Sequence, residues 1–300
     1  VVIVGGGVGG LSAAGALRGA NVEITLIDRR NHHLFQPLLY QVATASLSTS
    51  EIAWPIRHLL RKRPDTTTVM AEVEAIDTAR RAVMLDDGSE VTYDYLILAS
   101  GAQHAYFGHD EWEPFAPGLK TLEDATAIRR KLLIAFEKAG RATASAERRA
   151  LLTFAIVGAG ATGVELAGAV IELAHSTLKQ DFRTIHPEEV RVVLIEAGER
   201  VLANFKPQLS AYALTALQRL GVEVKLGHAV TAVDGDGVTA GGQHIAARTV
   251  LWAAGVEASP AARWLNAPAD RAGRIKVEAD LSVPGHPEIF AVGDTATITM

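Results

Sequence analysis

Hydrophobic and polar positions follow the same succession twice along the chain. Residues 1–4 form a short apolar run typical of a buried parallel strand, 9–18 have a helical pattern, and 23–27 form a second apolar run. The second succession consists of a strand, a helix and a strand at 154–157, 162–178 and 190–195. Strand, helix and parallel strand in this order make a β-α-β unit. We therefore predict an α/β protein with two Rossmann-like domains.

Alternating positions after each unit predict further strands. In the first half they occupy 69–76, 82–85 and 90–98, with Asp87-Gly88 as a hairpin turn. In the second half they occupy 222–226, 230–234 and the surroundings of Val238, with Asp236-Gly237 as a turn, before a helix-free run to a strand at 249–252. A helix is predicted at 207–220. Each domain is thus expected to carry a three-stranded β-meander.

The remaining segments predict how the domains are connected. Residues 31–50 lack a clear period, which favours a loop over a ligand, and 52–63 indicate a short helix with a basic end. Residues 119–139 indicate a helix, opened by the capping pattern Thr121-x-x-Asp124. The strand at 288–294 is expected to return to the first domain. The predicted domains are 1–120 with 266–300, a linker helix at 121–149, and an inserted domain at 150–265.

Composition excludes several kinds of chemistry. The 300 residues are 48% hydrophobic, and 29 Lys+Arg against 34 Asp+Glu give a net charge of −5, so no basic excess favours nucleic acid. The chain has no cysteine, which excludes disulfides, thiolate metal sites and thiol redox chemistry. The apolar stretch 154–174 contains Glu165 and Glu172, so we interpret it as strand and helix rather than a membrane span.

Two sites of possible polar binding have simpler interpretations. His32 and His33 are adjacent, so their side chains diverge, and no further ligand lies at metal-binding spacing; we predict a surface loop and no metal. The basic residues of 57–63 could contact anionic lipid, although a solvated helix end is the preferred interpretation. Because the chain opens inside a strand and only six residues follow Asp294, both ends are expected to lie within a longer protein.

Two glycine loops carry the clearest chemistry. Each has the pattern G-x-G-x-x-G after an apolar strand, where backbone N–H groups and a helix N-terminus can approach a pyrophosphate. The glycines are Gly5, Gly7 and Gly10 in the first copy and Gly158, Gly160 and Gly163 in the second. A later strand ends at Gly101, 96 residues after Gly5, and at Gly255, 97 residues after Gly158. Two such loops in register predict two bound dinucleotides and hence electron transfer, the alternative being tight turns that bind nothing.

An acidic residue follows the second strand of each unit. Asp28 lies 23 residues after Gly5, near the usual spacing of about 20, and Glu196 lies 38 residues after Gly158. Such a carboxylate accepts hydrogen bonds from a ribose and repels a 2′-phosphate. Glu196 therefore predicts a preference for NADH over NADPH, with nearby Arg200 as the reservation.

Several longer motifs resemble one family. The runs HHLFQPLLYQVA (32–43), YDYLILASGA (93–102), APGLKTLEDA (116–125), GVELAG (163–168) and WAAGV (252–256) are similar to the type II (alternative) NADH:quinone oxidoreductases, across essentially the whole chain. The resemblance implies FAD on the first loop and NADH on the second. The cofactor-binding residues that it and the motifs predict are Gly5, Gly7, Gly9, Gly10, Asp28, Arg29, Val73, Ala99, Ser100, Gly101, Gly293, Asp294, Gly158, Gly160, Thr162, Gly163, Glu196, Ala254 and Gly255.

The resemblance also implies a reaction. Hydride would pass from NADH to FAD and electrons to a membrane quinone, without proton pumping, since no thiol is present to accept them. Glu165, Gln36 and Pro37 are the predicted catalytic residues, Gln36 and Pro37 lying beside the flavin. For Glu165 the alternative is a carboxylate that only complements a helix dipole, worth about 0.3–1 kcal/mol.

The same resemblance implies a cellular location and leaves several alternative functions. It implies a peripheral protein on the cytoplasmic face of the inner or plasma membrane, attached through a C-terminal segment absent here. The given chain alone is expected to be soluble, and a homodimer is left open. Alternatives on the same scaffold are an NADH-dependent ferredoxin or rubredoxin reductase, an oxidase, or a sensor that binds both cofactors without catalysis.

Overall fold

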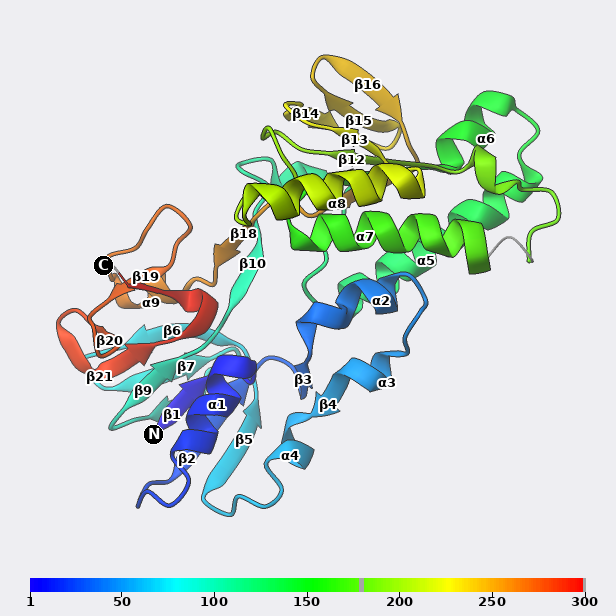
Figure 1. Ribbon diagram of the computed structural model, residues 1–300. Coiled ribbons are helices and arrows are strands. Elements are labelled where there is room, and N and C mark those ends of the chain that lie inside the picture. The colour runs from blue at the N-terminus through cyan, green and yellow to red at the C-terminus, as the bar shows by residue number, and fades with distance from the viewer. Residues whose placement is uncertain (178–180, 299–300) are drawn as a thin grey trace. The chain divides into compact units, whose positions relative to one another are not determined.

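The computed structural model describes residues 1–177 and 181–298, and the chain divides into two compact units (Figure 1). Unit 1 consists of Val1–Phe35, Ala53–Gln103 and Val256–Met300, and unit 2 of Gln36–Ile52 and His104–Gly255. The second unit is thus inserted into the first, as predicted. Their boundaries differ from the expected ones, because 36–52 and the predicted linker helix both cluster with unit 2.

Unit 1 is built on a six-stranded sheet. The strand order is β20-β21-β9-β1-β2-β5, and every pairing except β20 with β21 is parallel. The strands are β1 (Val2–Val4), β2 (Ile24–Asp28), β5 (Thr66–Met70), β9 (Leu96–Leu98), β20 (Ser282–Val283) and β21 (His286–Ala291). Strand β21 lies beside β9, which confirms that the late strand returns to the first domain.

Both faces of this sheet are covered, and the central strand shows it. Ile3 packs on one face with residues of α1 (Val8–Ala16), whereas Val2 and Val4 pack on the other with the antiparallel meander and α9 (Ala261–Leu265). Successive side chains of a strand point to opposite faces, so a strand covered on both sides is apolar throughout. The meander strands are β6 (Val73–Asp77), β7 (Ala82–Leu85) and β8 (Glu90–Thr92).

Smaller elements complete unit 1. Strands β3 (His32–Leu34) and β4 (Ala53–Pro55) pair antiparallel and lead into α4 (Ile56–Leu59). Strands β19 (Ile275–Val277) and β22 (Ala296–Ile298) pair in parallel, and β10 (Ala102–His104) pairs with β18 (Val256–Ala258). The 3₁₀ turn η5 (Gly293–Thr295) follows β21.

Unit 2 repeats the design with a four-stranded parallel sheet. Its order is β13-β12-β11-β17, from β11 (Thr153–Val157), β12 (Arg191–Ile195), β13 (Glu223–Lys225) and β17 (Thr249–Trp252). Ala155 and Val157 of β11 pack with the meander, whereas the intervening Phe154 stacks on Phe136 of α5 (Leu122–Arg141), with 5.5 Å between ring centroids. Helices α7 (Ala161–Glu172) and α8 (Pro207–Leu220) lie side by side (Figure 1).

The second meander differs in part from the prediction. It consists of β14 (Val230–Val233), β15 (Gly237–Ala240) and β16 (Gln243–Ala246). The predicted first strand, 222–226, is instead β13 of the parallel sheet, and β16 was not predicted. In unit 1, the predicted run 69–76 covers the end of β5 and all of β6 except Asp77, and 90–98 covers both β8 and β9. Short connections allow one apolar pattern to continue through two strands.

The segment predicted as a loop, 31–50, is largely structured. It contains β3, the 3₁₀ turn η1 (Gln36–Leu38), α2 (Leu39–Ala43) and the start of α3 (Thr49–Ile52). Helix α2 packs against α5 and α7, which explains why the segment belongs to unit 2. The helix predicted at 52–63 is limited to α4, because Ala53–Pro55 form a strand first.

The helix predictions of unit 2 are mostly confirmed. Thr121 caps α5 in a complete capping box: Asp124 N donates to Thr121 Oγ1 and Thr121 N donates to the Asp124 carboxylate. Helix α8 has the predicted bounds. Helix α7 ends at Glu172 and continues as a π-helical turn, η3 (Leu173–Thr177), and Leu178 lies outside the described residues. The other short elements are η2 (Asp110–Trp112), α6 (Ser145–Leu151) and η4 (Pro187–Glu189).

Among the described helices, none combines the length and the apolar character that crossing a bilayer requires.

Candidate functional site

The first glycine loop connects β1 to α1 at the carboxyl edge of the unit 1 sheet. Gly5 N donates to Ile27 O at 2.8 Å, and Gly5 has a φ of +108°, which disfavours any side chain. A Cβ on Gly5 would lie 2.2 Å from Ala99 O, and a Cβ on Gly10 would lie 1.8 Å from Gly5 O. These two glycines are therefore required by the packing of the chain itself.

The second loop, between β11 and α7, has the same contacts. Gly158 N donates to Ile195 O at 2.7 Å, and Gly158 has a φ of +99°. A Cβ on Gly158 would lie 2.4 Å from the Cα of Ala254, and a Cβ on Gly163 would lie 1.8 Å from Gly158 O. The two loops thus fold identically around their first and third glycines.

The middle glycines have no such reason to lack a side chain. Gly7 and Gly160 are exposed, they have φ values of −75° and −70°, and a Cβ on either would meet no protein atom within 4 Å. Each occupies the N-cap of its helix, where no side chain caps the free N–H groups. Such an end, open to the backbone and electropositive, fits a diphosphate.

The two acidic residues hold the glycine loops. Asp28 accepts hydrogen bonds from Gly6 N at 2.6 Å and Arg30 N at 2.7 Å. In the same way Glu196, which directly follows β12, accepts from Ala159 N at 2.7 Å and from Gly198 N at 2.8 Å. The long spacing to Glu196 therefore does not change the geometry. Because each carboxylate oxygen can accept a second bond, a ribose hydroxyl can still donate to it.

Strand β9 and the late strand β21 bring further predicted residues to the first loop. Val292 N donates to Leu98 O at 2.9 Å, and Gly101 N donates to Thr295 Oγ1 at 2.9 Å. A Cβ on Gly9 would lie 3.3 Å from Val292 Cγ2 and 3.5 Å from Ala99 Cβ. The predicted residues that gather at this edge are Gly5, Gly7, Gly9, Gly10, Asp28, Ala99, Ser100, Gly101, Gly293 and Asp294.

In unit 2 the closing strand is β17. Ala253 N donates to Val157 O at 2.7 Å, as Ala99 N donates to Val4 O at 2.8 Å in unit 1. Gly255 lies against an aromatic ring, since a Cβ there would be 2.5 Å from Phe107 Cζ. The predicted residues brought together here are Gly158, Gly160, Thr162, Gly163, Glu196, Ala254 and Gly255.

Two predicted cofactor residues have other surroundings. The side chain of Val73 is buried in the hydrophobic core of unit 1, so only its backbone is available to a ligand. Arg29 lies beside Asp28, but its half-exposed guanidinium approaches Glu72, with 3.6 Å between Nη1 and Oε1.

The predicted catalytic residues all belong to unit 2. Gln36 donates from Nε2 to Lys120 O at 3.1 Å, and the exposed Pro37 follows in η1, directly before α2. Glu165 is exposed on α7, the helix against which α2 packs. Partial burial raises the pKa of the Glu165 carboxyl. The carboxyl therefore keeps a proton to higher pH than an ordinary glutamate.

Three further contacts were not predicted. His33 Nδ1 lies 3.1 Å from Gly6 O, so this histidine supports the first loop instead of lying in a surface loop. Ser100 and Ser259 share a hydrogen bond of 2.6 Å between their hydroxyls. His104 Nε2 lies 3.2 Å from Asp124 Oδ2, which also accepts from Lys120 N. Each contact joins residues far apart in sequence, so no local pattern signals it.

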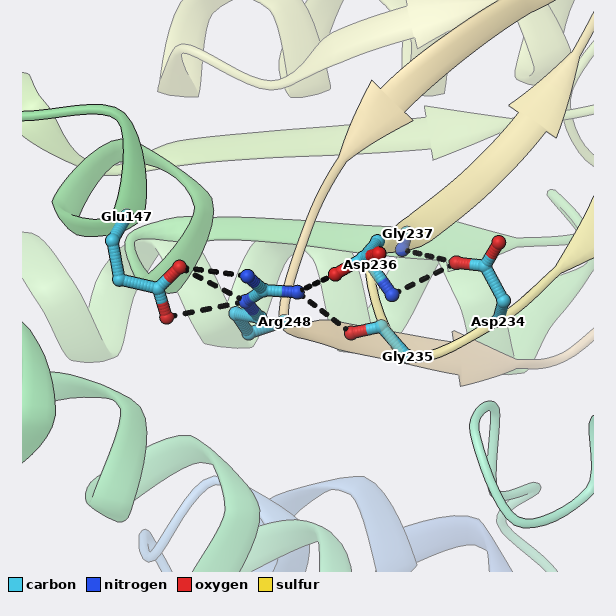
Figure 2. Close-up of polar contacts among 6 residues, drawn as sticks. All are labelled: Glu147, Asp234, Gly235, Asp236, Gly237 and Arg248. Atoms are coloured by element: carbon cyan, nitrogen blue, oxygen red, sulfur yellow. Dashed lines mark hydrogen bonds and ion pairs between the residues drawn. The ribbon is translucent and has the colours of Figure 1, made fainter.

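One ion-pair cluster fixes the start of the closing strand in unit 2 (Figure 2). Arg248 donates from Nη2 to Glu147 Oε2 of α6 at 2.7 Å and from Nη1 to Gly235 O at 3.0 Å. Its Nη1 also contacts the Asp236 carboxylate in the hairpin turn. Arg248 lowers the pKa of the Glu147 carboxyl. The cluster joins α6, the meander and β17, and it has a structural role.

Within residues 1–177 and 181–298, no three acidic or histidine side chains are arranged to hold a metal ion.

Comparisons with known proteins agree with this geometry. The chain is 48% identical to the type II NADH:quinone oxidoreductase NdhA of Mycobacterium tuberculosis, over 98% of this chain and 65% of that protein. It is 46% identical to the type II NADH:quinone oxidoreductase Ndh of the same organism, over 99% and 67% respectively. The chain thus spans about two thirds of the length of these relatives.

A solved structure shows the same fold. The structure of NDH2 from Plasmodium falciparum in complex with NADH superposes with a TM-score of 0.87 at 26% identity, covering 99% of this chain and 64% of that one. The sequence model of the family described as pyridine nucleotide-disulphide oxidoreductase matches residues 1–300. The chain therefore belongs to the pyridine nucleotide-disulphide oxidoreductases and, within them, to the type II NADH:quinone oxidoreductase family.

Proposed function

We propose that this chain is the dinucleotide-binding part of a flavin-dependent NADH:quinone oxidoreductase. The observation that carries the proposal is the pair of equivalent glycine loops, each with an exposed middle glycine whose missing side chain is explained by no contact within the protein. The names of the relatives from Mycobacterium tuberculosis support NADH and quinone as substrates. We assign FAD to the loop of unit 1 and NADH to the loop of unit 2.

Unit 1 would hold FAD along the carboxyl edge of its sheet. The diphosphate would contact the backbone at Gly7 and the first turn of α1, while Asp28 accepts a ribose hydroxyl. Gly293 and Asp294, beside Gly101, would meet the ribityl chain, as the family resemblance implies. Arg29 and the backbone of Val73 would line the adenine end.

Unit 2 would hold NADH in the same manner. Gly160 and Thr162 are at the helix end that faces the diphosphate, and Glu196 at the end of β12 would accept a ribose hydroxyl. A carboxylate at this position repels the 2′-phosphate of NADPH. Ala254 and Gly255 would border the nicotinamide half, where Phe107 leaves no room for a larger residue at position 255.

When bound, FAD accepts a hydride from NADH and passes two electrons to quinone. The chain supplies no thiol, so its own residues position, orient and handle protons. We assign proton handling to Glu165, because partial burial raises the pKa of its carboxyl and so favours the protonated form more than in an ordinary glutamate. Gln36, held by its bond to Lys120 O, and Pro37 would border the flavin ring.

The expected setting follows from the proposed acceptor. A membrane quinone requires action at a bilayer, and NADH is supplied on the cytoplasmic side, so we propose a peripheral protein on that face without proton pumping. We also propose a homodimer, which light scattering tests separately. A monomeric mass for the flavin-loaded full-length protein would exclude it.

The test is anaerobic mixing of the FAD-loaded protein with NADH. The visible flavin absorbance should bleach rapidly, and adding a short-chain quinone should restore it. Glu196→Gln should bleach more readily with NADPH than the parent does. Absorbance that is unchanged by NADH would indicate a non-catalytic binding protein. Faster reoxidation by ferredoxin, rubredoxin or oxygen than by quinone would favour a reductase or an oxidase.

A further inference from the structure

One basic surface of unit 1 has no part in the dinucleotide loops. Residues 53–64 contain Arg57, Arg61, Lys62 and Arg63 and no acidic residue, in a chain whose net charge is −5. The segment covers β4, α4 and the turn that leads into β5, and α4 lies beside β5 (Figure 1). Positive charge is therefore concentrated at one edge of the unit 1 sheet.

A shallow cavity of about 300 Å³, widely open to solvent, lies among these residues. Its lining consists of cationic and hydroxyl side chains with one leucine: Arg57, Leu60, Arg61, Arg63, Thr66 and Thr68. Arg63 is buried, its Nε and Nη2 donate to Asp65, and its Nη1 donates to Ala14 O at 2.6 Å. Because Arg63 neutralises Asp65, the carboxylate nearest the cavity does not cancel the charge of the other arginines.

The two exposed arginines are oriented without being neutralised. Arg57 Nη1 donates to Thr68 O at 2.9 Å, and Arg61 Nη1 donates to His58 O at 2.7 Å. Within the described part of the chain no carboxylate pairs with Arg57, Arg61 or Lys62. A carbonyl occupies one nitrogen of each guanidinium and leaves its remaining N–H donors for an anion.

Two apolar side chains of the same segment are also exposed. Trp54 is 49% exposed and Leu59 is 42% exposed, and the Trp54 ring lies 5.6 Å from the ring of His58. An exposed tryptophan next to cations is typical of a surface that meets the headgroup level of a bilayer, where an aromatic ring has an apolar and a polar side. A soluble anion would gain nothing from the exposed apolar surfaces of Trp54 and Leu59, whereas a lipid bilayer would bury them.

We propose that this surface, formed by Trp54, Arg57, Leu59, Arg61 and Lys62, binds anionic phospholipid. A headgroup phosphate occupies the cavity between Arg57 and Arg61, Lys62 adds attraction, and Trp54 and Leu59 enter the interface. The contact is distinct from any attachment elsewhere in the protein. It is also independent of the proposed reaction, because binding requires neither NADH nor quinone.

Vesicle cosedimentation tests the proposal on the FAD-loaded chain. Vesicles of phosphatidylglycerol and phosphatidylcholine should bind it, and pure phosphatidylcholine should bind it much less. The double variant Arg57→Gln/Arg61→Gln should bind roughly 25-fold more weakly, about fivefold per lost charge. The matched control is Arg219→Gln/Arg271→Gln, which removes two exposed arginines elsewhere and should change little.

Two further measurements separate the alternatives. The fluorescence difference between parent and Trp54→Phe should shift to shorter wavelength when anionic vesicles are added. Inorganic phosphate at matched ionic strength should compete weakly. Equal losses in both double variants, no binding to anionic vesicles, or full displacement by phosphate would each overturn the proposal. Unfolding curves with an unchanged midpoint confirm that the variants are folded.

Discussion

The two glycine loops are alike where a diphosphate is expected and differ where the rest of a dinucleotide would lie. In both, a Cβ on the third glycine would lie 1.8 Å from the carbonyl oxygen of the first, and a carboxylate accepts the N–H of the residue between the first two glycines. Unit 1 adds a late strand that brings Gly293 and Thr295 beside Gly101, whereas unit 2 places Phe107 against Gly255. We therefore expect the shared contacts to select for dinucleotides and the unshared ones to distinguish FAD from NADH.

The largest expected effect is the loss of stability when the third glycine of either loop is replaced. Gly163→Ala forces a methyl group into Gly158 O, and we expect it to lower the free energy of unfolding by about 3 kcal/mol or more. Gly10→Ala should do the same in unit 1. Denaturant titration measures both. Losses below about 1 kcal/mol would mean that the close approach is relaxed by a small backbone shift.

The middle glycines should show the opposite pattern. Gly160→Ala should leave the midpoint of unfolding almost unchanged but weaken NADH binding roughly tenfold to a hundredfold, about 1.4–2.8 kcal/mol. Gly7→Ala should instead weaken FAD binding. Calorimetry with each dinucleotide measures this. If one variant weakens both cofactors equally, the assignment of one cofactor to each unit is wrong.

Asp28 and Glu196 occupy equivalent positions in the two units, so replacing each of them tests a difference between the units. Glu196→Gln keeps the shape but weakens the hydrogen bonds from Ala159 N and Gly198 N, and should cost about 1–3 kcal/mol of stability. It should also lower the ratio of kcat/KM for NADH to that for NADPH. Asp28→Asn is the matched control, because it should destabilise the other loop without changing this ratio.

Replacing Glu165 should increase stability and decrease activity. Because its pKa in the folded state is raised, the folded protein binds more protons than the unfolded one, and stability decreases as pH rises through that pKa. Glu165→Gln should therefore slightly stabilise the protein above this pH while slowing turnover and removing one limb of its pH profile. Glu199→Gln, an exposed glutamate of the same unit, serves as control. An unchanged pH profile would leave Glu165 with a structural role only.

The smallest effect concerns acid stability in unit 2. Hydrogen bonds from Arg148 and from His186 N lower the pKa of Glu189 to about 2. A lowered pKa contributes stability above the unfolded value of about 4.3, and this contribution is lost as pH falls from there to about 2. Arg148→Met should reduce the dependence of the unfolding midpoint on pH in this window. A pair that is partly exposed should give only a small change.

Local patterns predicted the elements that local chemistry decides. Helix α5 begins where Thr121 and Asp124 form its capping box, and both β-α-β units follow apolar runs that are buried on two faces. The segment 31–50 was mispredicted because α2 is stabilised by packing on α5 and α7, which are far away in sequence. The supporting role of His33 likewise depends on a contact with Gly6 across 27 residues. Val73 was predicted to bind a cofactor, but its side chain is buried in the core of unit 1, so only its backbone could contact one.

Unit 1 consists of three separate segments of the chain, and this has a consequence for folding during synthesis on the ribosome. Its sheet needs β20 and β21, so this unit stays incomplete until residues 282–291 have emerged, whereas every segment of unit 2 is already available at residue 255. Domains fold as units during translation. The inserted unit can therefore fold before β20 and β21 have been added to the sheet of unit 1. Flavin incorporation is then a late event, and a nascent chain stalled before β21 should hold nicotinamide dinucleotide before it holds FAD.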